Sequence, residues 1–347
     1  MHPAVAEVAV VGLPDERWGQ RIAAFIKRAT TVEADALDAW CRQSSLAGFK
    51  RPRDYVFVAE IPKSPVGKIL RRLLVAGGAM TDPAPLLPTL PDSFDGFHLA
   101  IDPARERADI VLDRPPLNVV TMAEREQLRA VFEVPDADDR VRVIVVRAEG
   151  EHFSSGGEIR GFLDASPEHV SRLAWNIAAP ARCRKPVIIA SRGYCFGVGF
   201  ELALACDFRL ASETCLYSLP EQRLGQIPGS GGAARLQKMV GITRTKDIVM
   251  RSRRIAGRQA YDWGIATECV ADAELEAAAD KLAKELRGFP PLAQRTAKKL
   301  LNDIEETSLA LRIELEGQAY GRLRSSEDFR EGVEAFHQKR KPNFRGR

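Results

Sequence analysis

Short apolar runs within the first 61 residues predict a small α+β unit. The runs at residues 7–13, 22–29 and 53–61, the first of which reads EVAVVGL, are typical of strands. Residues 31–44 instead space their apolar side chains as an amphipathic helix does. We therefore predict a small domain at residues 1–75 that combines strands with at least one helix.

Proline and glycine interrupt this pattern after residue 75. The segment 75–93 reads VAGGAMTDPAPLLPTLPDS, and its two glycines and four prolines break any helical or strand period. We interpret residues 76–96 as a linker and residues 97–347 as a second domain.

Strand-like runs alternate with turn residues and helical patterns in this second domain. The runs lie at residues 97–102, 107–113, 141–150, 186–195 and 206–212. Such alternation predicts an α/β layer architecture. The chain from residue 231 onward is dominantly helical in its periodicity. Because a helical tail of this size commonly packs on neighbouring subunits, we expect an oligomer.

Composition and charge exclude several classes of function. A net charge of +4 over 347 residues is mild and is not gathered into a stripe, so nucleic acid is not an expected partner. The longest apolar runs fall short of the roughly 18 to 20 residues that cross a bilayer, and no basic leader precedes an apolar stretch at the start. We expect no membrane segment and a cytoplasmic location. The six cysteines are scattered and suggest neither a zinc site nor a disulfide framework.

Two glutamates suggest acid–base chemistry. Glu201 stands inside the apolar run GYCFGVGFELALACDF at residues 193–208, and Glu221 follows a proline in YSLPEQRLGQIPGSGG, where we expect a loop. A buried carboxylate is costly and tends toward its neutral form unless it has a partner or a use. Two carboxylates in a dry pocket can hold and activate water. For Glu221 the alternative is an ordinary acid in the first turn of a helix.

Glycines flank the same region. Gly156 and Gly157 follow a predicted strand, and Gly197 and Gly199 precede the predicted helix of Glu201. Glycine lets the backbone approach a ligand closely, and a helix amino terminus offers unpaired N–H groups to developing negative charge. Together these segments could form an oxyanion hole. Taken alone, such glycines more often only make turns or close packing.

These residues lie in ordered motifs that resemble a known family. The motifs are RPPLNVVT at 114–121, FSSGGEI at 153–159, GYCFGVGFELALACDFRLAS at 193–212, LPEQRLGQIPGSGGAARLQKMVG at 219–241 and the ending EDFREGVEAFHQKRKPNFRGR. Through them, residues 97–347 resemble the enoyl-CoA hydratase/isomerase family, also called the crotonase superfamily. The resemblance implies a spiral core of repeated ββα turns and a carboxyl-terminal helical region that assembles homotrimers or dimers of trimers.

The resemblance also implies roles for individual residues. The backbone N–H groups of Gly157 and Val198 match the oxyanion-hole donors; Val198 stands where glycine is usual, but only its N–H is needed. Glu201 matches the residue that positions and activates water, and Glu221 matches the residue that delivers a proton to C2. The substrate would be a coenzyme A thioester, without metal or redox cofactor.

Binding of the coenzyme A nucleotide is assigned more loosely. The family pattern suggests the loop that contains Glu158, Ile159 and Arg160, together with basic residues near the carboxyl end.

Residues 2–75 resemble a different protein, the mobile carboxyl-terminal lid of AMP-forming acyl-CoA synthetases. The signature is PKSPVGKILRR at residues 62–72, in which Lys68 matches the lid lysine that neutralises carboxylate and phosphate. The alternative for Lys68 is a solvated lysine at a helix start. The large adenylating domain with its Ser/Thr/Gly-rich phosphate loop does not occur in this sequence, so we expect no independent ligase activity. The lid is then a fusion remnant, with a vestigial Lys68, or it docks on a separate adenylating subunit.

The leading hypothesis is an enoyl-CoA hydratase that converts a 2-enoyl-CoA to a 3-hydroxyacyl-CoA. Alternatives with the same fold are an enoyl-CoA isomerase, a phenylpropenoyl-CoA hydratase-lyase and a cyclic dienoyl-CoA hydratase. A non-enzyme alternative is a scaffold that partners a separate acyl-adenylating subunit. The sequence leaves open the acyl group, the pathway, the stereochemistry and the choice between trimer and hexamer.

Overall fold

The chain folds as two compact units, Met1–Pro91 and Asp92–Arg347. The computed structural model describes residues 2–15, 19–44, 51–58, 60–61, 69, 74, 94–161, 166–304 and 307–347. The division between the units falls within residues 76–96, where the linker is expected. The end points of the two domains stay a prediction.

The first unit is a small α+β structure, as predicted. Strand β1 (Val5–Asp15) pairs antiparallel with β2 (Gly19–Arg28), and β2 pairs parallel with β3 (Asp54–Phe57). Successive residues of β2 point to opposite faces, so that Phe25 packs in one apolar cluster and Ile26 in another. The second cluster includes Leu37 of helix α1 (Ala34–Gln43), which covers that face.

The main sheet of the second unit runs in the order β12-β9-β7-β6-β5-β4 within the described residues. Its strands are β4 (Phe97–Asp102), β5 (Arg107–Leu112), β6 (Val143–Ala148), β7 (Val187–Ser191), β9 (Phe208–Ser212) and β12 (Glu268–Val270). β4 and β5 pair antiparallel and the remaining neighbours pair parallel. Strand β7 is buried along its whole length, as is typical of a parallel strand covered on both faces.

The chain enters a smaller sheet after β7 and after β9 of the main one. This sheet contains β8 (Tyr194–Phe196), β10 (Leu216–Ser218) and β11 (Ile255–Ala256), with β8 and β10 parallel. The chain passes from β7 to β8 and from β9 to β10, and Ser154, after β6, forms a parallel bridge with Cys195 of β8. Each turn therefore places one segment in either sheet before a helix follows, which is the expected ββα spiral.

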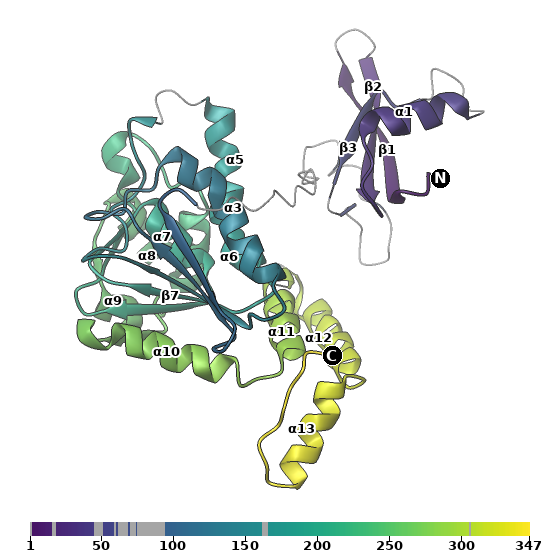
Figure 1. Ribbon diagram of the computed structural model, residues 1–347. Helices are drawn as coiled ribbons and strands as arrows, with labels where there is room; N and C mark the ends of the chain where they lie inside the picture. The colour runs from purple at the N-terminus through teal and green to yellow at the C-terminus, as the bar shows by residue number, and fades with distance from the viewer. Residues whose placement is uncertain are drawn as a thin grey trace. The chain divides into compact units, whose positions relative to one another are not determined.

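The helices cover both faces of the main sheet. They are α3 (Met122–Ala137), α5 (Pro167–Ile177), α6 (Ala179–Arg182), α7 (Val198–Ala205), α8 (Gly232–Met250), α9 (Gly257–Asp262) and α10 (Leu275–Leu286). Helix α10 lies along one face (Figure 1), where Ala279 packs with Val145 and Ile188. Every residue of α7 is buried, because its sequence is apolar or small on all sides except at Glu201. Helix α8 is interrupted at Gly241, where φ is 75°.

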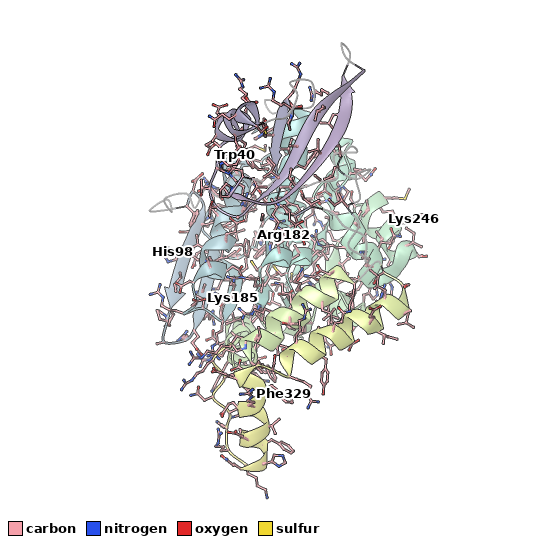
Figure 2. All side chains as sticks on the ribbon, turned by 90° about the vertical axis from the view of Figure 1, so that its right-hand side faces the viewer. Trp40, His98, Arg182, Lys185, Lys246 and Phe329 are labelled. Atoms are coloured by element: carbon pink, nitrogen blue, oxygen red, sulfur yellow. The ribbon has the colours of Figure 1, made fainter. Side chains whose placement is uncertain are left out.

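The carboxyl-terminal helices leave large apolar side chains uncovered. Helices α11 (Pro291–Asp303), α12 (Leu309–Leu323) and α13 (Glu327–His337) follow α10. Both figures show α13, marked by Phe329 in Figure 2, extending away from the sheets of the second unit. The exposed apolar side chains include Leu301, Leu309 at 72%, Ile313, Tyr320 and Phe336 at 82%.

Candidate active site

The loop that carries Gly156 and Gly157 is hydrogen-bonded to β8 through Ser154. The N–H of Ser154 donates to the carbonyl of Tyr194 at 2.8 Å, and the N–H of Phe196 donates to the carbonyl of Ser154 at 2.9 Å. The Ser154 hydroxyl is fully buried, donates to the carbonyl of Asn118 at 2.7 Å and accepts the N–H of Gly156 at 3.2 Å. Ser154 thus links the glycine loop by hydrogen bonds to β8 and to Asn118.

The same loop pairs with the segment that leads into α3. The N–H of Val120 donates to the carbonyl of Gly156 at 2.9 Å, and the N–H of Glu158 donates to the carbonyl of Val120 at 3.0 Å. In this parallel bridge the residue between them, Gly157, turns its own N–H away from Val120. The N–H of Gly157 therefore remains available on the other side of the loop.

A second N–H donor lies at the start of α7. Gly197 precedes the helix with φ at 51°, a left-handed value that favours glycine, and its carbonyl accepts the first helical bond from the N–H of Glu201. Val198 is the first helical residue, so its N–H has no acceptor one turn earlier. Among the backbone hydrogen bonds outside helices and strands in the described residues, none uses the N–H of Gly157 or Val198.

These two donors come from neighbouring segments. A Cβ atom built on Gly197 would lie 3.7 Å from Cα of Gly156, so the loop and the helix start lie close together. Two unpaired N–H groups at adjacent positions suit the oxygen of a thioester carbonyl on which negative charge develops.

Glu201 is buried within α7 and is held by the start of α8. Its side chain is 3% exposed, and Oε1 accepts the N–H of Ser230 at 2.6 Å and the N–H of Gly232 at 3.2 Å. A Cβ on Gly232 would lie 3.0 Å from Cγ of Glu201, so glycine makes this close approach possible. Burial raises the pKa of Glu201, while the two N–H donors and the charge of Arg125 oppose that rise.

Glu221 lies in the first turn of the 3-10 helix η2 (Pro220–Leu224), whereas the sequence led us to expect a loop. Pro220 begins this turn, because its fixed φ suits the first position of a helix. Glu221 is therefore also an acidic residue in a helical first turn, which was the alternative expected from the sequence. Its Oε1 lies 3.2 Å from the position that a Cβ on Gly197 would take, and its Oε2 is buried without a hydrogen-bond partner among the described residues. Burial raises the pKa of Glu221 to about 7, and the negative charge of Glu201 adds to the rise.

The structure therefore brings four of the predicted residues together. Glu221 lies against Gly197, next to the N–H of Val198, and the charges of Glu201 and Glu221 act on each other. Burial raises the pKa of both groups, but Glu201 accepts two N–H groups, which favours its ionised form, while Glu221 has a buried oxygen without a hydrogen-bond partner among the described residues. Such a pair can supply one base and one acid near neutral pH.

Sequence reasoning missed one buried charge, Arg125 of α3. The residue is 7% exposed, and its positive charge lowers the pKa of both Glu201 and Glu221. The signal was present in the helical pattern, because Arg125 shares an apolar face with Leu128 and Phe132. A charged residue on the buried face of an amphipathic helix calls for a partner of opposite charge.

The residues assigned to the coenzyme A nucleotide lie at the surface. Glu158, Ile159 and Arg160 are exposed, with Ile159 at 54%. Of these three, Glu158 lines an open groove of about 550 Å³ next to the amino terminus of α3, together with Arg114, Thr121 and His169 among others. The groove adjoins the loop of Gly157 and offers room for part of a large ligand. Lys68, the lid lysine, lies outside the described residues.

A larger cavity lies elsewhere in the second unit. It has a volume of about 790 Å³ and is lined by α8, α11 and the carboxyl end of α7, including the ion pair of Lys298 with Asp207 at 2.6 Å. Neither Glu201 nor Glu221 lines it. Within the described ranges, no group of histidine, cysteine and acidic side chains is arranged to hold a metal ion, and no helix is long and apolar enough to span a membrane.

A model of the enoyl-CoA hydratase/isomerase family matches residues 106–347. The chain belongs to the enoyl-CoA hydratase/isomerase family. A second model, for the carboxyl-terminal domain of AMP-binding enzymes, matches residues 1–68. Both resemblances noted in the sequence are thereby confirmed.

Similar proteins and similar solved structures support this membership. The chain is 32% identical over 244 residues to a probable mitochondrial enoyl-CoA hydratase 2 of Arabidopsis thaliana, covering 69% of this chain and 81% of the relative. It is 33% identical over 247 residues to a carnitinyl-CoA dehydratase of Proteus mirabilis, covering 69% and 95%.

Among solved structures, an enoyl-CoA hydratase from Bacillus anthracis aligns with a TM-score of 0.68 at 29% identity, covering 73% of this chain and all of that one. A putative enoyl-CoA hydratase from Streptomyces coelicolor aligns with a TM-score of 0.71 at 29% identity, covering 77% and 100%. The crotonase fold is thus confirmed, and family membership indicates hydratase or isomerase chemistry on an acyl-CoA.

Proposed function

We propose that the second unit hydrates the 2,3 double bond of a 2-enoyl-CoA and forms a 3-hydroxyacyl-CoA. The observation that carries this proposal is the pair of carboxylates, Glu201 and Glu221, in unlike environments beside the N–H groups of Gly157 and Val198. Hydration needs one group that takes a proton from water and another that gives a proton to carbon.

In the proposed reaction the thioester oxygen accepts hydrogen bonds from the N–H groups of Gly157 and Val198. Water attacks C3 of the polarised double bond while the carboxylate of Glu201 takes one of its protons, and negative charge develops on the thioester oxygen. Protonated Glu221 then delivers its proton to C2. Water supplies both the hydroxyl group at C3 and the proton that Glu201 takes. After the reaction Glu201 is protonated and Glu221 is ionised. Exchange of protons with solvent restores the starting state of both groups before the next turnover.

The proposed reaction consists of the addition of water to C3 and two proton transfers, with no transfer of electrons to or from a cofactor, so we propose that it needs no metal or redox cofactor. Coenzyme A is part of the substrate, and its nucleotide would extend along the exposed loop of Glu158, Ile159 and Arg160. The groove beside Glu158 supports this placement.

Dehydration of a 3-hydroxyacyl-CoA is a second candidate. It is the reverse of hydration and uses the same two carboxylates, and the relatives named carnitinyl-CoA dehydratase favour it. An isomerase, a phenylpropenoyl-CoA hydratase-lyase and a cyclic dienoyl-CoA hydratase need the same oxyanion hole. Product analysis with a panel of acyl chains separates these reactions from one another.

The test of hydration is loss of the ultraviolet absorbance of the conjugated thioester. A short 2-enoyl-CoA and a cinnamoyl-type CoA are compared with the wild type, Glu221→Gln and Glu201→Gln. Glu213→Gln, at an exposed position, is the matched control. We expect rapid loss with the wild type and the control, and a rate lower by roughly 10² to 10⁴ when either site glutamate is changed. Equal rates in all four proteins would contradict the proposal.

For the first unit we propose no independent ligase activity. Its likeness to the carboxyl-terminal domain of AMP-binding enzymes supports two roles, a fusion remnant or a lid that docks on a separate adenylating subunit. Co-purification with a tagged adenylating subunit of the same cell distinguishes them. A stable complex together with no enoyl-CoA turnover would favour the non-enzyme alternative of a scaffold.

We further propose a homotrimer or a dimer of trimers, supported by the apolar side chains exposed on α11, α12 and α13. Light scattering after size exclusion measures the mass. We expect Leu309→Asp and Ile313→Asp to lower it in steps of whole subunits. A wild type that elutes as a monomer at micromolar concentration would contradict this proposal.

A further inference from the structure

Ser154 lies beside both elements that supply the proposed oxyanion donors. Its hydroxyl accepts the N–H of Gly156 at 3.2 Å, next to the donor Gly157. A Cβ atom built on Gly199 would lie 2.7 Å from Cβ of Ser154 and 3.1 Å from its Oγ, so Ser154 occupies the space beside the first turn of α7. That turn begins with the second donor, Val198. The hydration proposed above gives Ser154 no task.

The first donor belongs to a peptide unit that is held at its carbonyl. The carbonyl of Gly156 and the N–H of Gly157 are parts of one planar trans unit, in which the two groups point in opposite directions. Because the N–H of Val120 donates to that carbonyl at 2.9 Å, the N–H of Gly157 points away from Val120. A single hydrogen bond does not by itself stop this unit from rotating.

Ser154 restrains the same unit from the other side of Gly156. Gly156 has φ at 115°, a value that favours glycine, and glycine has more backbone freedom than any other residue. The Ser154 hydroxyl holds the N–H of Gly156, while Val120 holds its carbonyl. With both ends held, the φ and ψ angles of Gly156 are restrained, and with them the direction of the Gly157 N–H.

The Ser154 hydroxyl is itself held in one orientation. It has a single proton, which it donates to the carbonyl of Asn118 at 2.7 Å, so its oxygen remains to accept the N–H of Gly156. The backbone of Ser154 is bonded to Tyr194 and Phe196 of β8 on either side. Ser154 is fully buried, so water does not compete for these bonds.

The second donor has its direction fixed in a similar way. The carbonyl of Gly197 accepts the N–H of Glu201 at 2.9 Å, and the N–H of Val198 belongs to the same peptide unit and points the opposite way, out of the helix start. The distance between the two donors then depends on what lies between the glycine loop and α7. Ser154 lies there, in the space that a side chain on Gly199 would need.

We infer, on the basis of the proposed hydration, that Ser154 is a positioning residue, which sets the direction of one oxyanion donor and its distance from the other. The hydroxyl acts on Gly157 through Gly156, and the Cβ atom keeps the glycine loop apart from α7. Negative charge on the thioester oxygen develops in the transition state, so a displaced donor lowers kcat more than it raises KM.

The first test is steady-state kinetics of the full chain with a 2-enoyl-CoA. Ser154→Ala removes the hydroxyl and keeps the Cβ, and Ser154→Cys leaves a weaker hydrogen-bonding group in its place. We expect kcat to fall by roughly 10- to 100-fold in Ser154→Ala with little change in KM, and Ser154→Cys to lie between Ser154→Ala and the wild type. An unchanged kcat, or a loss confined to KM, would overturn the inference. If Ser154→Ala does not fold, as judged by circular dichroism, Ser154→Cys is compared with the wild type by the same criteria.

The matched control is Ser212→Ala. Ser212 is also fully buried, and its hydroxyl lies 3.2 Å from that of Thr214. It ends β9, which contributes no residue to the proposed site. We expect this variant to lose thermal stability while its kcat stays close to that of the wild type. An equal loss of kcat in Ser212→Ala and Ser154→Ala would mean that removal of any buried hydroxyl has this effect, and the inference would be wrong.

A spectroscopic readout needs no turnover. In an aminocinnamoyl-CoA the electron-donating amino group is conjugated with the thioester carbonyl, so hydrogen bonds to the carbonyl oxygen move its absorption to longer wavelength. We expect this red shift when the compound binds to the wild type and to Ser212→Ala, and a smaller shift with saturating Ser154→Ala. Equal shifts in all three proteins would contradict a role of Ser154 in placing the donors.

The two readouts separate this inference from the hydration itself. A wild type that gives the red shift but does not hydrate overturns the hydration, and a smaller shift in Ser154→Ala then still supports the role of Ser154. An active wild type with the same kcat and the same shift in Ser154→Ala overturns the inference and leaves hydration standing. No red shift with the wild type overturns both, because neither donor then polarises the thioester.

Discussion

Replacing Glu221 with glutamine should remove activity and at the same time stabilise the fold above neutral pH. Burial raises the pKa of Glu221 from its ordinary value of 4.5 to about 7. A carboxyl group whose pKa is higher in the folded state binds more protons there than in the unfolded chain. Its contribution is therefore fully present below about pH 4.5, and stability is lost as the pH rises from there to about 7.

The size of the effect follows from the size of this rise. One pKa unit corresponds to about 1.36 kcal/mol, so a rise of about 2.5 gives roughly 3 kcal/mol as an upper figure. The residue is only half-buried, and solvent screening reduces the figure, so we expect about 1 to 3 kcal/mol. Glutamine does not ionise, so the variant escapes this loss.

The assay is thermal unfolding of the second unit between about pH 5 and pH 9. The wild type, Glu221→Gln and the exposed control Glu213→Gln are compared. Any packing difference caused by the glutamine amide is independent of pH. The informative quantity is therefore the difference in Tm between Glu221→Gln and the wild type, followed as the pH changes. We expect Glu221→Gln to gain several degrees relative to the wild type as the pH rises, at about 2 to 4 °C per kcal/mol. If the plots of Tm against pH for Glu221→Gln and the wild type were parallel, the reasoning would be refuted.

Two further predictions concern glycines. Gly232→Ala places a Cβ 3.0 Å from Cγ of Glu201, so the carboxylate must move; we expect kcat to fall by roughly tenfold or more, and an unchanged kcat would contradict the placement of Glu201. Gly96 and Gly225 have similar positive φ values, 69° and 70°, but a Cβ on Gly96 would overlap Oε1 of Glu124 at 1.7 Å while one on Gly225 meets nothing within 4 Å. Calorimetry should therefore show a larger loss of unfolding free energy for Gly96→Ala than for Gly225→Ala, by about 1 kcal/mol or more from the broken capping box, and equal losses would speak against this role.

The motifs in the sequence indicated the segments of the candidate site because each depends on local chemistry. Glycine before a helix predicts a free N–H, and Gly197 does precede α7 with a left-handed φ. A lone glutamate in an apolar helix predicts a buried carboxylate, and Glu201 is buried. Both features can be identified without knowing what lies across the space between elements.

The remaining features depend on contacts between distant parts of the chain. The N–H donors that hold Glu201 come from Ser230 and Gly232, and the charge that acts on it comes from Arg125, far from it in sequence. The turn of Glu221 is helical because Pro220 starts it and the start of α7 packs against it. Periodicity within one segment can indicate that a buried charge needs a partner, but it does not identify the partner.

The measurement that tests the central claim most directly is turnover of a 2-enoyl-CoA in water labelled with oxygen-18, followed by mass analysis of the product. Hydration predicts a 3-hydroxyacyl-CoA that carries one labelled oxygen at C3, formed by the wild type and by Glu213→Gln but not by Glu221→Gln. A product of unchanged mass with a shifted double bond, or no product from any of a panel of enoyl-CoA thioesters, would contradict the claim.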